Sequence, residues 1–263
     1  MLAEQTWVLT GAAGNVAGCL RPALEGRVAR MRLLDLSAVA PLRAHEEAIA
    51  CDLRDLAALT AALAGADGAI HLGGIADEAP FADLAAVNIV GTYNVLEAAR
   101  RGGVRRVVFA STNHVTGLYP GNVTVEPTMP ARPDSLYGAS KAAGEALCRL
   151  YAEKFGIGIA CIRIGTFEQA PPDARSLRTW LSPADCAAAF LAAMTAPDLS
   201  FAIFYGVSRN SRRFWDLAAG EALGYDPHDD AERFAATIEG TTADDDPQGG
   251  RFASPDYTLE RQR

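Results

Sequence analysis

Tyr137 and Lys141 are the residues of this sequence with the clearest potential for chemistry, because only three residues separate them in a segment expected to be helical. On an α-helix this spacing places both side chains on one face, one turn apart. A free tyrosine keeps its proton until about pH 10, so it is a poor base at neutral pH. A neighbouring ammonium favours the phenolate. We therefore expect Lys141 to lower the pKa of Tyr137 and to make it a general base.

A tyrosine and a lysine at this spacing occur by chance in many helices, so the pair gains its meaning from its context. The sequence supplies two further features. One is a glycine-rich turn close to the N-terminus, and the other is the polar cluster Ser111-Thr112-Asn113-His114. Together the three features indicate an oxidoreductase site that uses a nicotinamide dinucleotide.

The glycine-rich turn follows the apolar residues 7–10 and comes directly before a helical pattern. Its spacing is G-x-x-G-x-x-A, with Ala17 at the third position. Glycines at such a turn let the backbone approach a pyrophosphate, which then lies at the helix N-terminus. A glycine-rich turn is often nothing more than a turn, but the strand–turn–helix context favours dinucleotide binding. The residues expected to contact the cofactor here are Gly11, Gly14, Asn15 and Val16.

Asp35 closes the second expected strand, where a carboxylate would bind the adenosine ribose. It would also repel the additional phosphate of NADP, and no arginine follows it directly. The sequence therefore favours NAD, and the alternative interpretation of Asp35 is an ordinary loop carboxylate.

His71, inside the fourth expected strand, is interpreted as a packed structural histidine. The residues expected in the same cleft after the third and fourth strands are Asp52 and Leu53 beside the adenine, and Leu72, Gly73 and Gly74 under the middle of the cofactor.

The first two-thirds of the chain alternate short apolar runs with longer helical patterns, which predicts βαβ units and a parallel sheet. The expected strands are 7–10, 32–36, 48–51, 68–72, 106–110 and 157–164, and the expected helices are 14–24, 54–63, 81–101 and 136–155. The fold class is therefore α/β, a Rossmann-type doubly wound parallel sheet. We expect residues 1–165 to form the dinucleotide-binding domain and residues 166–263 to form a small substrate-binding region that is not an independent domain.

The pattern weakens after residue 164. A loop is expected at 168–173, a helix that opens at Ser182-Pro183, a strand at 201–207 and a helix at 214–223. Residues 241–250 contain an acidic run, Asp244 to Asp246, and are expected to form a solvated loop without a functional role.

Bulk composition is that of an ordinary enzyme, with 49% hydrophobic residues, a net charge of −8 and a pI near 5.1. The charge argues against nucleic acid and anionic membranes as partners. No apolar stretch approaches the roughly 18 residues of a membrane span. The five cysteines are scattered and contain no C-x-x-C pair, which indicates reduced thiols in a cytoplasmic protein and no metal site. We also expect a homo-oligomer, whose subunit number the sequence does not fix.

The residues named above resemble the extended branch of the short-chain dehydrogenase/reductase superfamily, and more specifically the NAD-dependent uronate dehydrogenases. The resemblance to the superfamily rests on the T-G-x-x-G turn, Asp35, Asp52-Leu53 and the Tyr137/Lys141 pair. The more specific resemblance rests on the segments 71–75, 88–100, 108–114, 130–134, 163–165 and 179–180, and on Ser182. It extends from the N-terminus to about residue 225.

The resemblance implies roles for individual residues. Tyr137 would be the catalytic base, Lys141 would also hold the nicotinamide ribose, and Thr112 would supply the hydroxyl that partners the tyrosine. Ser111, Thr112 and Asn113 would bind the sugar, and His114 would either join them or support their loop. Phe167 would lie near the nicotinamide.

Three further positions bear on the substrate. Thr166 matches a small hydroxyl residue that the family places on the sugar, and Arg175 matches the arginine that binds its carboxylate. A planar guanidinium suits a carboxylate, although without the resemblance Arg175 would be interpreted as a solvated loop cation. Ala76 departs from the family, which has a serine at this point of the substrate and cofactor site, so one polar contact is lost.

The resemblance thus implies oxidation of a free hexuronate, such as galacturonate or glucuronate, at C1 to the aldarolactone. The short region after the sixth strand agrees, because enzymes that act on nucleotide sugars need more chain to hold the nucleotide. Two alternatives stay open. One is a nucleotide-sugar epimerase or dehydratase of the same superfamily, and the other is a non-catalytic regulator that senses NAD, which the Tyr137/Lys141 pair disfavours.

Overall fold

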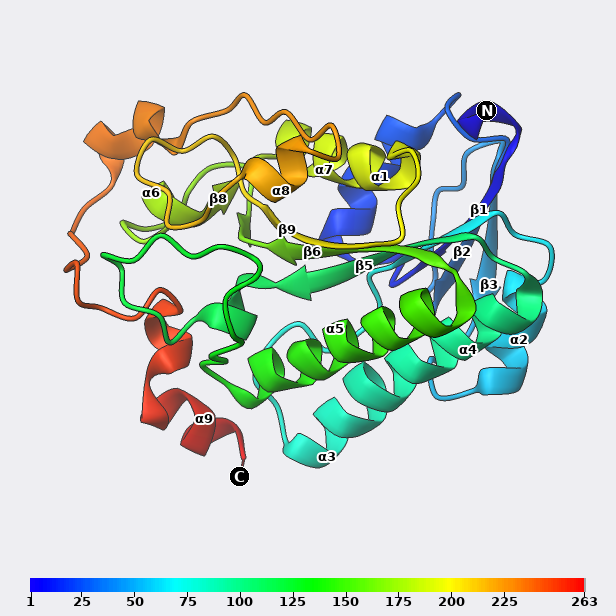
Figure 1. Cartoon of the computed structure of the whole chain (residues 1–263), viewed down its shortest axis with the longest axis horizontal. Coiled ribbons are helices and arrows are strands. Elements are labelled where there is room, and N and C mark those ends of the chain that lie inside the picture. Colours follow the sequence, from blue (N-terminus) through cyan, green and yellow to red (C-terminus); the bar gives the residue numbers. More distant parts are fainter. Residues whose placement is uncertain (263) are drawn as a thin grey trace.

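The central element of the computed structural model, which describes residues 1–262, is a seven-stranded sheet (Figure 1). Every pair of neighbouring strands is parallel. In spatial order the strands are β3 (Glu46–Ala50), β2 (Arg30–Asp35), β1 (Thr6–Thr10), β4 (Gly68–His71), β5 (Arg106–Thr112), β6 (Gly158–Ile164) and β9 (Phe201–Gly206). The predicted α/β class and the doubly wound parallel sheet are confirmed.

Helices cover both faces of the sheet (Figure 1). One face carries α1 (Asn15–Leu24), α7 (Pro183–Thr195) and α8 (Ala218–Glu221), and the other carries α2 (Leu56–Leu63), α4 (Gly91–Gly102) and α5 (Leu136–Phe155). Along β5 and β6, successive side chains enter the two cores in turn: Val107 and Phe109 pack on one side, and Val108 and Ala110 on the other. A strand covered on both faces must be apolar throughout, which explains the continuous apolar runs.

The order of the strands reverses at β1, which lies between β2 and β4. Helices that follow neighbouring strands on either side of such a point lie on opposite faces, so a crevice opens at the carboxyl ends of these strands. The residues after β1, β2 and β4 therefore meet at one edge of the sheet.

The remaining elements are short. They are η1 (Leu2–Glu4), α3 (Phe81–Leu84), η2 (Ala85–Val90), η3 (Asn113–Thr116), β7 (Thr166–Phe167), α6 (Ser176–Thr179), β8 (Trp180–Leu181), η4 (Ala231–Thr237), η5 (Gly250–Ala253) and α9 (Pro255–Arg261). No helix within residues 1–262 has the length and apolar character needed to cross a membrane.

The helix expected at 81–101 is interrupted by the π-helical segment η2. Its buried residue Asn88 accepts a hydrogen bond from the Ile75 backbone N–H (2.8 Å) and donates to the Ile75 carbonyl (3.0 Å) and to Ser140 Oγ (2.9 Å). Asn88 thereby joins the loop after β4 to α5. Wide turns of this kind frequently occur at functional sites.

Two predictions for the C-terminal third were wrong. Only residues 218–221 of the helix expected at 214–223 are helical, because Trp215 instead bridges Val125 in strand-like pairing. The segment 241–250 is not solvated throughout. Its acidic run is exposed, but Gln248 is buried and donates hydrogen bonds to the Pro120 and Val123 carbonyls. The expected division of the chain at residue 165 stays a proposal, and β9 from the later part pairs with β6 of the earlier part.

The start of α5 is fixed by two side chains, one from the residue before the helix and one from the loop after β4. Ser135 accepts a hydrogen bond from the Gly138 N–H as the N-cap. The buried carboxylate of Glu78 accepts hydrogen bonds from the Leu136 N–H (3.1 Å) and the Tyr137 N–H (2.8 Å). These contacts satisfy donors that a helix leaves free in its first turn, and they complement its positive end.

Gly144 sets the distance between α5 and the sheet, because a Cβ atom at this position would lie 2.6 Å from the Phe109 ring. We expect Gly144→Ala to lower the free energy of unfolding by about 1–3 kcal/mol, since the ring is buried and must shift. The matched control is Gly18→Ala in α1, where a Cβ atom would meet nothing within 4 Å. There the same substitution should stabilise the protein by roughly 0.5–1 kcal/mol. Urea unfolding of both variants measures the difference, and a Gly144→Ala protein as stable as the parent would contradict the close packing.

Candidate active site

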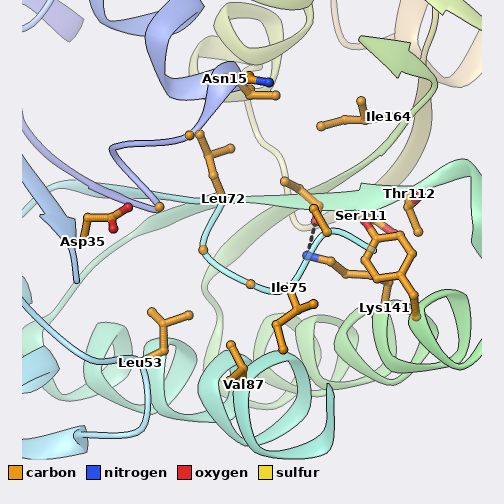
Figure 2. A pocket seen from close by; sticks show the side chains of 18 of the residues that line it. Asn15, Asp35, Leu53, Leu72, Ile75, Val87, Ser111, Thr112, Lys141 and Ile164 are labelled. Carbon is orange, nitrogen blue, oxygen red and sulfur yellow. Dashed lines mark hydrogen bonds between the residues drawn. The ribbon is translucent and has the colours of Figure 1, made fainter. Parts of the chain in front are cut away.

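A cavity of about 720 Å³ follows the carboxyl edge of the sheet across the crevice beside β1. Figure 2 shows Asp35 at one end of it and Thr112 with Lys141 at the other. All fourteen residues predicted to contact a dinucleotide line this cavity: Gly11, Gly14, Asn15, Val16, Asp35, Asp52, Leu53, Leu72, Gly73, Gly74, Ala76, Tyr137, Lys141 and Phe167. Their assignment to individual parts of the cofactor stays a prediction.

The backbone at the glycine-rich turn fits a pyrophosphate. Gly11 has a φ of +70°, and a Cβ atom there would lie 2.7 Å from the Gly73 backbone nitrogen. Only glycine permits both the conformation and the close approach. Gly14 precedes α1 as an N-cap without a side-chain hydrogen bond, so no side chain competes with an anion for the first N–H groups of this ten-residue helix.

Beside this turn, the Asp35 carboxylate accepts hydrogen bonds from the Ala13 N–H (3.0 Å) and the Ser37 N–H (2.8 Å). These bonds orient a carboxylate that lines the cavity, as expected for a residue that binds a ribose. Asp52 forms an ion pair with Arg54 at 2.6 Å, beside Leu53 on the cavity wall.

The two candidate catalytic side chains are both deeply buried. Lys141 Nζ donates to the Ala110 carbonyl (2.9 Å), and burial lowers the pKa of Lys141 to about 8. Burial also raises the pKa of Tyr137 to about 12, against a lowering contact with Thr112. The structure therefore differs from the expectation that Lys141 lowers the pKa of Tyr137, because desolvation outweighs the other influences on the phenol.

Behind Ser111 lies a buried ion pair that sequence analysis missed. The Ser111 hydroxyl donates to Glu145 Oε1 (2.6 Å), and Arg163 donates to both oxygens of Glu145 (2.9 and 2.8 Å). Glu145 follows Lys141 by four residues, as Lys141 follows Tyr137, so the three side chains share one face of α5. This repeated spacing was the signal in the sequence.

Arg175 lies beyond the main cavity, on the wall of a smaller one of about 210 Å³. Its guanidinium donates to Asn113 Oδ1 (2.8 Å), to the Gln248 carbonyl (2.6 Å) and, at 3.5 Å, to Thr166 Oγ1. Within residues 1–262 it forms no ion pair with a carboxylate. Desolvation lowers the pKa of Arg175 to about 10. The structure thus joins Arg175 and Thr166 to the cluster at Asn113.

The C-terminal segment contributes side chains that sequence analysis did not anticipate. Phe252 stacks on His114 with 3.9 Å between ring centroids, and the Tyr257 hydroxyl donates to Asp77 in the loop after β4. The helical elements η5 and α9 that carry these residues are too short to give a periodic pattern, and their aromatic residues are the main indication in the sequence that they pack on something. His71 is confirmed as a packed histidine, with Thr10 and Thr92 hydroxyls on its two ring nitrogens.

The parallel sheet, the glycine-rich turn and the Tyr137/Lys141 pair define a Rossmann-type oxidoreductase that uses a nicotinamide dinucleotide. The profile of the NAD-dependent epimerase/dehydratase family matches residues 7–170. The chain is 43% identical over 252 residues to a uronate dehydrogenase of Agrobacterium fabrum, an alignment that covers 93% of this chain and 95% of that protein. The chain belongs to the NAD-dependent epimerase/dehydratase family and, within it, groups with the uronate dehydrogenases.

Solved structures agree with this assignment. The glucuronic acid dehydrogenase from Chromohalobacter salexigens superposes with a TM-score of 0.93 at 40% identity, over 97% of this chain and 99% of that one. A mutant uronate dehydrogenase from Agrobacterium tumefaciens, complexed with NAD, superposes with a TM-score of 0.89 at 42% identity, over 95% of this chain and 97% of that one. The predicted family resemblance is confirmed.

The lowered pKa of Lys141 predicts a stability that depends on pH. An unfolded lysine titrates near 10.5, so between about pH 8 and pH 10.5 the unfolded chain binds more protons at this residue than the folded chain. The destabilisation from the buried ammonium is therefore complete below pH 8 and disappears as the pH rises toward 10.5. Lys141→Met should be more stable than the parent at pH 7, by up to about 3 kcal/mol, while its activity is lost.

Unfolding experiments at pH 7 and at pH 10 measure this difference. The control is Lys154→Met, which changes the only other lysine, exposed in the last turn of the same helix. Its stability should follow that of the parent at both values of pH. A Lys141→Met advantage that is equal at pH 7 and pH 10 would contradict the assignment of the penalty to the ammonium.

Proposed function

We propose that this protein oxidises a free hexuronate, galacturonate or glucuronate, at C1 to the corresponding aldarolactone with NAD as the oxidant. The family and the relatives described above support the reaction, since enzymes named uronate dehydrogenase and glucuronic acid dehydrogenase match nearly the whole chain. The observation in this chain that carries the proposal is Arg175, a partly buried cation that has no carboxylate partner among the described residues.

The substrate would provide that partner. A buried guanidinium without a counter-charge is unfavourable, and a carboxylate on the ligand satisfies it through two parallel hydrogen bonds. Arg175 contacts Asn113 and Thr166, so a sugar acid held by its carboxylate would extend past this cluster toward Ser111 and Thr112. Ser111, Thr112, Asn113, His114, Thr166 and Ala76 are thus proposed to form the sugar site together with Arg175.

NAD, when bound, accepts the hydride from C1 and brings a positively charged nicotinamide ring that favours a phenolate over a phenol. Gly11, Gly14 and the start of α1 would hold its pyrophosphate, and Asp35 would bind the adenosine ribose and disfavour NADP. Tyr137 would remove the proton of the anomeric hydroxyl, with Thr112 hydrogen-bonded to the reacting oxygen. Lys141 would hold the nicotinamide ribose.

The principal rival is a nucleotide-sugar epimerase or dehydratase, which returns the hydride within each cycle. A non-catalytic NAD sensor is the second rival, and the buried Tyr137/Lys141 pair argues against it. Incubation with free uronic acids and, separately, with nucleotide sugars distinguishes all three by NADH absorbance. We expect NADH to accumulate only with free uronates.

Tyr137→Phe should lose nearly all of this turnover and still bind NAD, whereas a Tyr137→Phe rate close to that of the parent would refute its role as base.

Arg175 should govern the choice between acidic and neutral sugars. A neutral hexose has the same anomeric hydroxyl but nothing to pair with the guanidinium. We expect the parent to prefer uronates by orders of magnitude in kcat/KM, because a buried unpaired charge costs several kcal/mol. Arg175→Ala should reduce turnover of galacturonate and glucuronate and narrow the gap to galactose and glucose. Arg175→Lys should rescue only partly, since one ammonium does not reproduce the two-pronged geometry. An unchanged ratio of acid to neutral sugar in Arg175→Ala would mean that another residue binds the carboxylate.

We also propose that the protein is cytoplasmic and forms homo-oligomers. The five cysteines are free within residues 1–262, as in a reducing compartment. The outer surfaces of two neighbouring helical segments expose apolar side chains that a second copy could cover, namely Val90 and Tyr93 near the start of α4, and Leu150 and Phe155 on α5.

A further inference from the structure

The imidazole of His114 is held on two sides. Its Nδ1 lies 2.7 Å from Oδ2 of Asp134, whose side chain is fully buried. Its ring stacks on Phe252. His114 also lines the main cavity, and its other ring nitrogen, Nε2, makes no hydrogen bond to the described residues. One ring nitrogen is therefore committed to the protein, and the other is free for a ligand.

The partner at Nδ1 decides which nitrogen carries the proton. An ionised carboxylate accepts hydrogen bonds and donates none, so neutral His114 must have its proton on Nδ1. Nε2 then has a lone pair and acts as an acceptor. The Asp134 backbone N–H also donates to the His114 carbonyl (3.3 Å), which fixes the two residues relative to each other.

Close packing leaves the Asp134 carboxylate no alternative position. A Cβ atom on Gly117 would lie 1.7 Å from Oδ2, and one on Gly249 would lie 1.8 Å from it. The other oxygen, Oδ1, accepts a hydrogen bond from the Ser135 hydroxyl (2.8 Å), which in turn accepts from the Gly138 N–H. The carboxylate is thus enclosed by two glycines and oriented by the N-cap of α5.

Ser111 and Asn113, which neighbour His114, also use hydrogen-bond donors within the protein. The Ser111 hydroxyl donates its proton to Glu145, and Asn113 Nδ2 donates to the Ile164 carbonyl (2.9 Å). These two donors are therefore used within the protein, and Ser111 Oγ keeps a lone pair for a ligand. A ligand rich in hydroxyl donors, such as a sugar, matches this pattern.

We propose that Asp134 is a positioning residue that holds His114 in the Nδ1–H tautomer, so that Nε2 accepts a hydrogen bond from a hydroxyl of the sugar acid. The inference rests on the proposed function, in which His114 belongs to the sugar site. It adds a residue that acts through His114 without touching the substrate, and it assigns the direction of the hydrogen bond between His114 and the sugar.

Nitrogen-15 labelling of histidine makes the tautomer directly observable, because the chain contains only four histidines. The spectrum of the full-length parent is recorded at a pH where histidine is neutral, and the His114 signals are assigned by their loss in His114→Ala. We expect the Nδ1–H pattern for His114. An Nε2–H pattern in the parent would overturn the proposal, whether or not any variant folds.

Asp134→Asn should reverse the tautomer. If Ser135 keeps its hydrogen bond to the side-chain oxygen, the amide nitrogen of Asn replaces Oδ2 and faces Nδ1, which must then accept. The control is Asp77→Asn, which removes a second negative charge that acts on His114 but makes no hydrogen bond to its ring. We expect Asp77→Asn to keep the Nδ1–H pattern. Reversal by both variants would indicate an effect of charge alone and would contradict the proposal.

Kinetics test whether the tautomer matters for the substrate. A lost hydrogen bond to the sugar should lower kcat/KM for the uronate about tenfold or more in Asp134→Asn, with NAD affinity unchanged. In a His114→Ala background the same substitution should have no further effect, because Asp134 would act only through His114. Equal losses in both backgrounds would overturn the proposal. The spectra do not depend on the substrate, so failure of uronate oxidation and failure of the tautomer assignment are separate results.

Discussion

The contact of α5 with β5 and β6 is the interaction on which the rest of the site depends. Gly144 brings the helix against Phe109, and the buried pair of Glu145 and Arg163 joins the helix to β6. Removing one partner of such a pair typically costs about 3–5 kcal/mol, because a charge is left buried alone. The pair therefore locks the rotation of α5 about its axis. The face that carries Tyr137 and Lys141 then points to the carboxyl end of β5, where Ser111 and Thr112 lie.

The burial that fixes these side chains also opposes their charged forms. It moves the pKa of Tyr137 upward and the pKa values of Lys141 and Arg175 downward. Ionisable groups with pKa values shifted by burial are common at active sites, where they supply reactivity and lower the stability of the fold. Each of the two cations lies where a ligand can supply negative charge or hydrogen-bond acceptors. The folded protein without ligand is accordingly less stable than its packing alone would allow.

The sequence was sufficient to predict the sheet, most helices and many of the residues that line the main cavity. Strands such as β5 and β6 have apolar runs because both faces are buried, and Gly11, Gly14 and Asp35 are local features with fixed places relative to a strand. The missed parts depend on contacts between distant residues. Glu78, Asp134 and Gln248 are polar residues of irregular loops, and no periodic pattern distinguishes a buried loop carboxylate from a solvated one. The pKa of Tyr137 was also misjudged, because spacing along a helix reports neighbours but not the extent of desolvation.

The C-terminal segment has a consequence for the order in which the protein takes shape. Phe252 and Tyr257 reach back to His114 and Asp77, across 138 and 180 positions of the chain. Contacts between such distant positions form after the local ones, because the chain between them must first become ordered. A chain folded only as far as β6 already contains the glycine-rich turn, Asp35 and the Tyr137/Lys141 pair, but it lacks Arg175, Gln248 and Phe252. Most residues proposed to bind the dinucleotide therefore precede β7, whereas the wall around the proposed sugar site is completed only by contacts of Gln248 and Phe252.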